Sequence, residues 1–134
     1  MELPIRENIL DTRFEGKSIK VYIQGAREPL EGVVDEVAKY EVGLRVEGKA
    51  VILFRHAILY IVTEPMEFHG YSIEELGETI LTADFIGSEL EVHLVNGDVV
   101  KGKLTKLSRY EVGIVSNEGG LVIPKVSISY VVVS

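Results

Sequence analysis

The stretch that decides the fold is Lys39-Tyr40-Glu41-Val42-Gly43, because the chain carries it a second time as Arg109-Tyr110-Glu111-Val112-Gly113. The two copies differ only by the exchange of one basic residue for another. A fixed-period repeat of this kind indicates one small module written twice. The similarity extends outwards at offsets of 70 or 71, with Gly16 matching Gly87, Val21 matching Val92, Gly32 matching Gly102, Ile58 matching Ile128 and Tyr60 matching Tyr130.

The repeat sets the predicted domain organisation. We expect a first module over residues 1–64, a linker over 65–71 with Pro65 and Gly70 as breakers, and a second module over 72–134. Modules of about 60 residues are near the lower limit for folding alone. They usually gain stability by packing on each other or by forming oligomers.

Alternation of polar and apolar residues predicts five short strands in each module. In the first module they are expected over residues 18–24, 30–37, 41–46, 50–54 and 58–62. In the second module they are expected over residues 89–95, 99–107, 111–116, 121–123 and 126–133. The fraction of Val, Ile and Leu suits such strands.

A short amphipathic helix is expected ahead of each set of strands. One covers residues 4–14, and the other covers 72–80, where Ser72 and Glu75 form a capping box. Gly32, inside a predicted strand, predicts a sharp bend. The sequence therefore predicts a mainly β fold of two tandem modules. Each module is a short N-terminal helix plus a five-stranded, strongly bent antiparallel small barrel.

The final strand raises a separate expectation. Tyr130-Val131-Val132-Val133 is apolar on both of its faces. As an exposed edge it would be an aggregation hazard. We therefore expect it to pair with a strand of another module.

The sequence gives little support for catalysis. It contains no Cys, so disulfides and thiolate metal sites are excluded. His56, His69 and His93 are scattered without the spacing of metal ligands. There is no nucleophile elbow and no phosphate-binding glycine loop. We expect a protein that is not an enzyme, with no metal site and no cofactor.

Charge and hydropathy restrict the partners. The net charge of −7 argues against broad, sequence-independent nucleic-acid binding, which depends on Lys and Arg. Local patches would then decide what binds. The first residues lack the basic and apolar segments of a signal peptide, and no apolar run approaches membrane-spanning length. We expect a soluble, cytoplasmic protein without a membrane partner.

Two short motifs stand out in the chain. The first is a strand, an Asn-Gly turn, a strand with a central glycine and an aromatic residue, formed by Asn96-Gly97, Gly102 and Tyr110. The second is Phe54-Arg55-His56-Ala57, which is similar to a Tyr-Lys-His-Ala segment. Together they resemble the motifs of the Sm-like (LSm) superfamily, and most closely those of its Hfq branch of hexameric RNA chaperones. The resemblance implies a tandem duplication of the Sm fold.

The resemblance also implies RNA-binding positions. In such rings the pore-side face binds uridine-rich RNA, and an aromatic residue stacks on a base. The opposite face binds adenine-rich RNA in part through a tyrosine of the first strand, matched by Tyr22 and imperfectly by His93. The implied pore-side residues are Lys39, Tyr40, Arg55, His56, Arg109, Tyr110 and Lys125.

The residues themselves support two interpretations of this set. Lys39-Tyr40 and Arg109-Tyr110 each place a cation beside a ring, which suits stacking of single-stranded bases. The tyrosines could equally pack beside a turn, and His56 could orient a corner through a backbone hydrogen bond. Glu41 and Glu111 could set salt bridges between modules or repel RNA.

Two functions from different classes remain open. The first is single-stranded RNA binding at the pore of a ring, as an RNA chaperone. The second is a structural or adaptor ring that has lost RNA binding, which the acidic balance and Val126 in place of the histidine favour. Equal use of two fused modules allows only even-membered rings. By analogy with Hfq hexamers, three chains would form a homotrimer with pseudo-six-fold symmetry.

Overall fold

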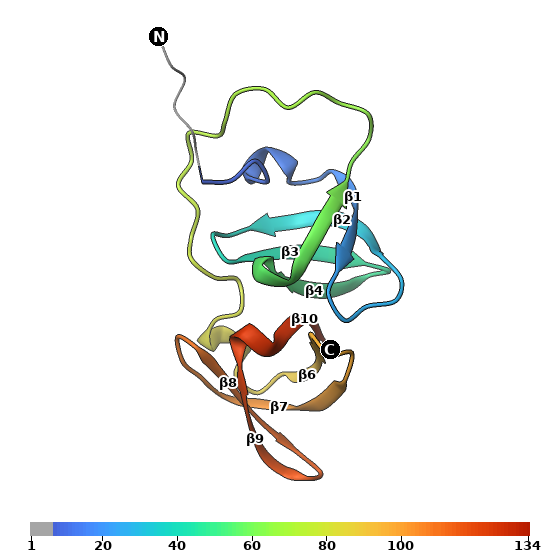
Figure 1. Ribbon diagram of the computed structural model, residues 1–134. Helices are drawn as coiled ribbons and strands as arrows, with labels where there is room; N and C mark the ends of the chain where they lie inside the picture. Colours follow the sequence, from blue (N-terminus) through green and yellow to red (C-terminus); the bar gives the residue numbers. More distant parts are fainter. Residues whose placement is uncertain (1–6) are drawn as a thin grey trace.

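The computed structural model describes residues 7–134, which form a mainly β protein (Figure 1). The first half contains five strands: β1 (Ser18–Ile23), β2 (Leu30–Val37), β3 (Glu41–Val46), β4 (Lys49–Phe54) and β5 (Ile58–Val62). The second half contains the other five: β6 (Glu89–Leu94), β7 (Val99–Leu107), β8 (Glu111–Ser116), β9 (Gly119–Pro124) and β10 (Ile128–Val133). The ten predicted strands are therefore confirmed, with ends that differ by at most two positions.

All ten strands belong to one sheet, in the order β5-β1-β2-β3-β4-β10-β6-β7-β8-β9. Every neighbouring pair is antiparallel. Each half has the same internal order, because β10 lies beside β6 just as β5 lies beside β1. The halves join where β4 pairs with β10, and Leu53 lies opposite Tyr130 there.

The prediction of two five-stranded barrels is wrong. The sheet is single and open, with β5 and β9 as its two edges. The physical reason lies in β10, whose two backbone edges pair with β6 of its own half and with β4 of the other half, so that the two halves share one sheet. Its Val131, which is completely buried, lies opposite Ile52 of β4 and Val92 of β6. The expectation that this strand pairs across the halves is confirmed.

The two predicted helices are also wrong. Part of the first lies outside the described residues, and the rest contains only the single 3₁₀ turn η1 (Thr12–Phe14). The second predicted helix, residues 72–80, is irregular and runs along the first half (Figure 1). There the carbonyls of Gly77 and Glu78 accept hydrogen bonds from the amides of Lys39 and Tyr40, at 2.8 and 3.1 Å. These tertiary bonds override the local helical pattern.

The remaining 3₁₀ turns repeat with the strands. η2 (Arg55–Ala57) and η4 (Lys125–Ser127) join the last two strands of each half, and η3 (Ala83–Phe85) precedes β6 as η1 precedes β1. Within residues 7–134 no helix is long and apolar enough to cross a membrane.

Two glycines at equivalent positions of β2 and β7 lie close to the backbone of the neighbouring strand. A Cβ atom at Gly32 would collide with the carbonyl oxygen of Arg45, and one at Gly102 would lie 2.6 Å from the carbonyl oxygen of Val115. The bent strands β2 and β7 also carry irregularities of register at matching positions, where each pairs with the next strand. Backbone therefore lies close to Gly32, and the irregularity of β2 falls a little further along, between Val34 and Glu36.

Two apolar clusters fill the interior, and each borrows from the other half. The cluster built on β1–β5 includes Tyr130 of β10. The cluster built on β6–β10 includes Ile52 and Phe54 of β4. Since the side chains of β4 and β10 serve both clusters, the strand junction is part of the core.

Candidate functional site

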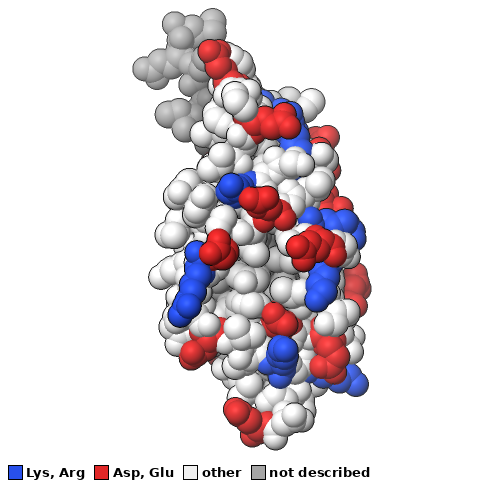
Figure 2. All heavy atoms as spheres, turned by 90° about the vertical axis from the view of Figure 1, so that its right-hand side faces the viewer, with Lys and Arg blue, Asp and Glu red and all other residues white. Residues whose placement is uncertain are grey.

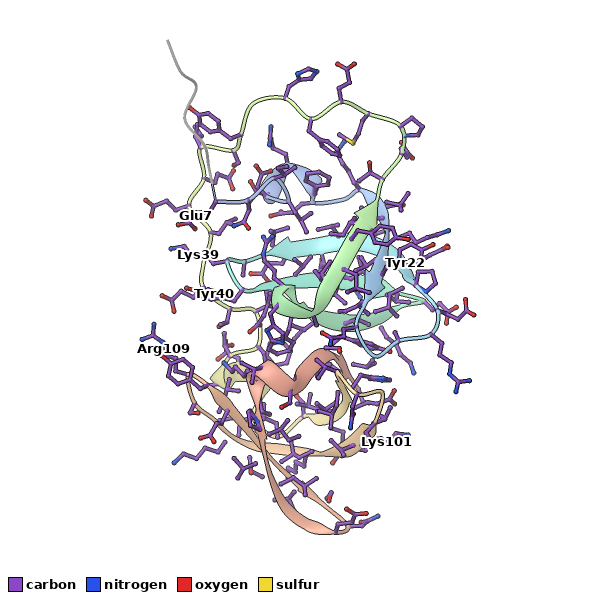
Figure 3. The ribbon with its side chains drawn as sticks, viewed as in Figure 1. Glu7, Tyr22, Lys39, Tyr40, Lys101 and Arg109 are labelled. Atoms are coloured by element: carbon purple, nitrogen blue, oxygen red, sulfur yellow. The ribbon has the colours of Figure 1, made fainter. Side chains whose placement is uncertain are left out.

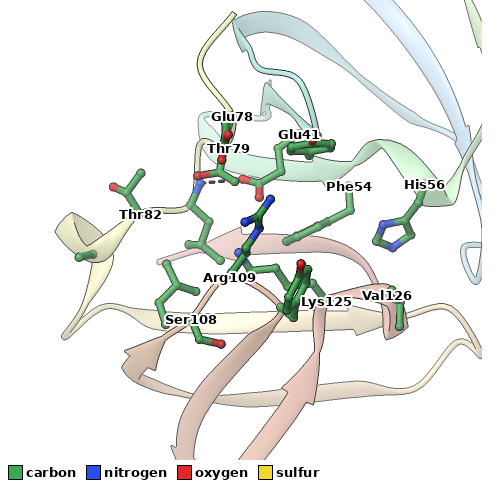
Figure 4. A pocket seen from close by; sticks show the side chains of 15 residues that line it. Glu41, Phe54, His56, Glu78, Thr79, Thr82, Ser108, Arg109, Lys125 and Val126 are labelled. Carbon is green, nitrogen blue, oxygen red and sulfur yellow. Dashed lines mark hydrogen bonds between the residues drawn. The ribbon is translucent and has the colours of Figure 1, made fainter.

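A pocket of about 780 Å³ lies at the junction and takes its walls from both copies of the repeated pentapeptide (Figure 4). Glu41, Phe54 and His56 of the first half lie on one side. Lys125 and neighbouring residues of the second half lie on the other. The segment ahead of β6 closes a third side with Glu78, Thr79, Leu81, Thr82 and Ala83.

The structure brings five of the eight predicted site residues to this pocket and leaves three outside it. The five that line it are Tyr40, His56, Arg109, Tyr110 and Lys125. Those outside are Lys39, Arg55 and Tyr22. The sequence predicted one set of site residues in each repeat. The structure brings members of both sets to the same pocket.

Two tyrosine side chains that line the pocket are exposed to solvent. Tyr40 is 58% exposed and Tyr110 is 71% exposed. The guanidinium carbon of Arg109 lies 5.6 Å from the centroid of the Tyr110 ring, within the range of a cation–π contact. An exposed aromatic face beside a cation can accept a planar ligand with negative charge nearby.

The second motif is fixed to these tyrosines in the same way in both halves. The amide of Arg55 donates to the carbonyl oxygen of Tyr40 at 3.0 Å, and the amide of Lys125 donates to that of Tyr110 at 2.8 Å. The basic position is thus held beside the ring by the backbone. Within the described residues Lys125 forms no ion pair with a carboxylate, so its charge is available to a ligand.

The guanidinium of Arg55 forms hydrogen bonds to backbone carbonyl oxygens and so stabilises the fold. Its Nε and Nη2 donate to the carbonyl oxygen of Ala38 at 3.0 and 2.9 Å, and Nη2 also donates to that of Leu10 at 2.8 Å. Burial lowers the pKa of this guanidinium. Arg55 therefore ties the corner after β4 to two loops, whereas its equivalent Lys125 lines the pocket together with Arg109.

His56 serves the junction and the pocket together. Its Nε2 lies 2.8 Å from the carbonyl oxygen of Ile128, so the ring bridges the two halves when this nitrogen carries the proton. The ring is also tilted against that of Phe54, at a centroid distance of 5.9 Å. This position is compatible with both expected roles of His56, which were orientation of the corner and a contact with RNA at the pore.

Lys39 and Tyr22 lie away from the pocket. Lys39 lines a groove with acidic residues, including Glu7 and Glu74. Figure 3 shows Lys39, Tyr40 and Arg109 along one side of the molecule and Tyr22 on the other. There Tyr22 stacks on Tyr60, with ring centroids 4.4 Å apart and planes at 13°.

The repeat preserves that stacked pair on the second half. His93 lies on Tyr130, with centroids 4.1 Å apart and planes at 13°. Figure 2 shows that positive and negative side chains are interspersed on this side of the molecule. Lys101, for example, lies 3.7 Å from Glu91. This face does not offer a continuous basic surface.

Glu41 is the pocket residue whose role sequence reasoning missed. It is 1% exposed, and its Oε1 accepts hydrogen bonds from the amides of Ile80 and Leu81 at 2.8 and 2.7 Å. Burial raises the pKa of Glu41, while the two amides and nearby Lys125 oppose that effect. The only sequence signal was the identity of Glu41 and Glu111 in the repeat.

Among the described residues no group of three or more His, Asp and Glu side chains could hold a metal ion. No protein-family model and no curated protein matches the sequence. The assignment of the pocket therefore rests on its geometry.

Proposed function

We propose that the protein binds single-stranded RNA at the junction pocket, as a member of the Sm-like superfamily with RNA-chaperone activity. The observation that carries the proposal is the meeting of Tyr40, Tyr110, Arg109 and Lys125 at one pocket. Stacking of a base on an exposed aromatic ring contributes about 1–3 kcal/mol and tolerates any base. Arg109 and Lys125 supply charge-assisted hydrogen bonds to phosphate.

The size of the pocket supports the same proposal. A volume of about 780 Å³ falls within the usual range of small-molecule sites and accommodates a nucleotide. His56, Thr79 and Ser108 add polar groups around its wall, which suits hydrogen bonds to a base edge. Because the chain carries a net charge of −7, binding depends on these few residues rather than on a general basic surface.

Self-association is the second part of the proposal. The edge strand β9 is the repeat equivalent of β4, and the edge strand β5 is the equivalent of β10. The internal β4–β10 register, transferred to the equivalent positions of β9 and β5, places Tyr60 opposite Ile123 and Ile61 opposite Val122 of another copy. An interface of this head-to-tail kind closes into a ring or extends as a filament. Resemblance to Hfq hexamers favours three chains.

The alternative is a structural or adaptor ring without RNA. Two carboxylates at the pocket, Glu41 and Glu78, and Val126 in place of a second histidine favour it. Both functions share the assembly, so only binding measurements separate them. A high ratio of absorbance at 260 to 280 nm in freshly purified protein supports the first.

The test is a titration of the protein with short U-rich and A-rich oligonucleotides at several salt concentrations. We expect Lys125→Ala to weaken binding and to lower the salt dependence. Lys103→Ala, which removes the same charge from exposed β7 away from the pocket, is the matched control. Equal affinity of both variants and the wild type overturns the pocket assignment. Light scattering that reports a single chain mass of 14.9 kDa at all concentrations overturns the ring.

A further inference from the structure

The junction inside the chain has a second connection besides its strands. Residues 78–81 (Glu-Thr-Ile-Leu) lead into the second half and place their last two amides on the carboxylate of Glu41. Residues 7–10 (Glu-Asn-Ile-Leu) occupy the equivalent place before the first half, at an offset of 71. The carboxylate equivalent to Glu41 is Glu111. The repeat therefore contains both partners of a second such contact, at opposite ends of the sheet.

Within one chain those two partners are not in contact. Glu41 is 1% exposed, but Glu111 is exposed on β8. The Glu111 side chain makes no hydrogen bond or ion pair within residues 7–134, and neither do the amides of Ile9 and Leu10. Ile9 is 65% exposed, while its equivalent Ile80 is half-buried.

The segment before β1 is held in the same position as the segment before β6. The amide of Gly16 donates to the carbonyl oxygen of Val34 at 2.8 Å, and that of Gly87 donates to Leu104 at 2.8 Å. The amide of Val34 donates to the carbonyl oxygen of Lys17 at 2.9 Å, and the amide of Leu104 donates to the carbonyl oxygen of Ser88 at the same distance. By this equivalence, a second copy that pairs its β5 with β9 would bring its Ile9 and Leu10 towards Glu111.

We propose that the carboxylate of Glu111 accepts hydrogen bonds from the amides of Ile9 and Leu10 of a second copy of this chain. The inference rests on the proposed β5–β9 assembly and names the contact that locks it. A second pair of equivalent residues supports this contact. Inside the chain, the amide of Tyr40 donates a hydrogen bond to the carbonyl oxygen of Glu78. By the same offset, Tyr110 donates its amide to Glu7 of the next copy. Figure 3 shows Glu7 on the same side of the molecule as Arg109.

Between copies the contact builds a second pocket. Inside the chain the wall formed by residues 78–83 completes the junction pocket beside Tyr40. At the interface, residues 7–12 complete an equivalent pocket beside Tyr110. By the same offset, that second pocket has Val126 where the first has His56, and His56 where the first has Val126, so the assembly alternates two pockets in which these side chains exchange places.

The experiment compares Glu111→Ala with Glu89→Ala, which removes an exposed carboxylate from β6, a strand that already has two neighbours. Sedimentation velocity over a range of concentrations measures the association of each. We expect Glu111→Ala to weaken association about tenfold or more, because a charged acceptor of two amides is lost. Glu89→Ala stays within about twofold of the wild type. Equal association of both variants overturns the proposal.

Two further measurements distinguish failure of the proposed assembly from failure of the Glu111 contact. Ile9→Pro removes one donor from the other side of the contact, and we expect it to weaken association as well. Hydrogen exchange of the Leu10 amide is slow in the assembled wild type and fast in assembled Glu111→Ala. A wild type that stays monomeric overturns the assembly itself. A wild type that assembles, with a Leu10 amide that exchanges equally fast in both proteins, overturns the Glu111 contact alone.

Discussion

The Oε1 atom of Glu41 lies 2.7 Å from the backbone nitrogen of Leu81, across the junction of the two halves. The same oxygen also accepts the amide of Ile80 at 2.8 Å. Leu81 is 1% exposed and packs in the cluster of the second half. One carboxylate therefore joins β3 of the first half to the segment that enters the second.

Removing this carboxylate leaves two amides without an acceptor and away from water. We expect Glu41→Ala to lower the free energy of unfolding by about 2 kcal/mol or more, since each unsatisfied buried donor costs about 1–3 kcal/mol. Urea denaturation followed by circular dichroism measures the change. Glu89→Ala, on the exposed side of β6, is the control and stays within about 0.5 kcal/mol of the wild type. A Glu41→Ala protein as stable as that control contradicts the role.

The pH dependence of stability follows from the same residue. Burial raises the pKa of Glu41 above its ordinary value of 4.5. A carboxyl with a raised pKa binds its proton more tightly in the folded state, so its contribution is fully present below 4.5 and is lost as pH rises through the folded pKa. We expect the stability of the wild type relative to Glu41→Gln to fall as pH rises from 4.5. A difference that grows with pH contradicts this sign.

The mid-strand glycines give a steric prediction. We expect Gly32→Ala and Gly102→Ala each to lower the free energy of unfolding by about 1–3 kcal/mol, because the added carbon meets backbone oxygen and the strand must shift. Gly120→Ala is the matched control, since nothing lies within 4 Å of a Cβ there. Thermal melts of the three variants measure the effect. Equal melting temperatures for all three rule out the close approach as the cause of the bend.

The strands were predictable because their signals are local. The alternation of polar and apolar residues and the glycines in turns indicate where each strand begins and ends. The predicted ends of β2, for example, are those observed. The pairing of β4 with β10 is not a local property, because the two strands lie far apart in the chain. The sequence pattern does not indicate which strand edges will pair. The barrels were therefore wrong, although the need of β10 for a partner could be read from its two apolar faces.

The helices and part of the site failed for a related reason. Ser72 does accept a hydrogen bond from the amide of Glu74, as an N-cap does, yet Gly77 bonds to Lys39 and the helix does not form. At the site, the repeat singled out Tyr40 and Tyr110, and both line one pocket. It could not show that Arg55 is occupied by a backbone carbonyl, because side-chain bonds to distant carbonyls leave no pattern in sequence.

Asp11 holds Ser72, the residue directly after the linker, to η1, and acid should release this end of the linker. Asp11 accepts hydrogen bonds from Arg13 and from the amide of Ser72, at 2.9 and 3.1 Å. Burial works against ionisation, but these bonds prevail and lower the pKa of Asp11 below 3.8. The stabilisation is present above 3.8 and is lost as pH falls through the folded pKa.

For this linker we expect Asp11→Ala to speed amide exchange at Ser72 at neutral pH, because the acceptor of that amide is gone. The wild type should lose protection there only in acid. Asp84→Ala, an exposed aspartate in η3, is the control and leaves exchange at Ser72 unchanged. Equal protection at Ser72 in both variants shows that Asp11 does not hold the linker.

The proposed stacking site makes a prediction about the Tyr110 ring alone. Tyr110→Phe keeps the aromatic face beneath Arg109 and removes only the hydroxyl. We expect its affinity for a short U-rich oligonucleotide to stay within about twofold of the wild type. Tyr110→Ala removes the face, and a loss of about 1–3 kcal/mol per stacked base corresponds to roughly 5- to 150-fold weaker binding. Fluorescence anisotropy of a labelled oligonucleotide measures both. If the Phe variant loses as much as the Ala variant, the hydroxyl rather than the ring carries the interaction, and stacking at Tyr110 is wrong.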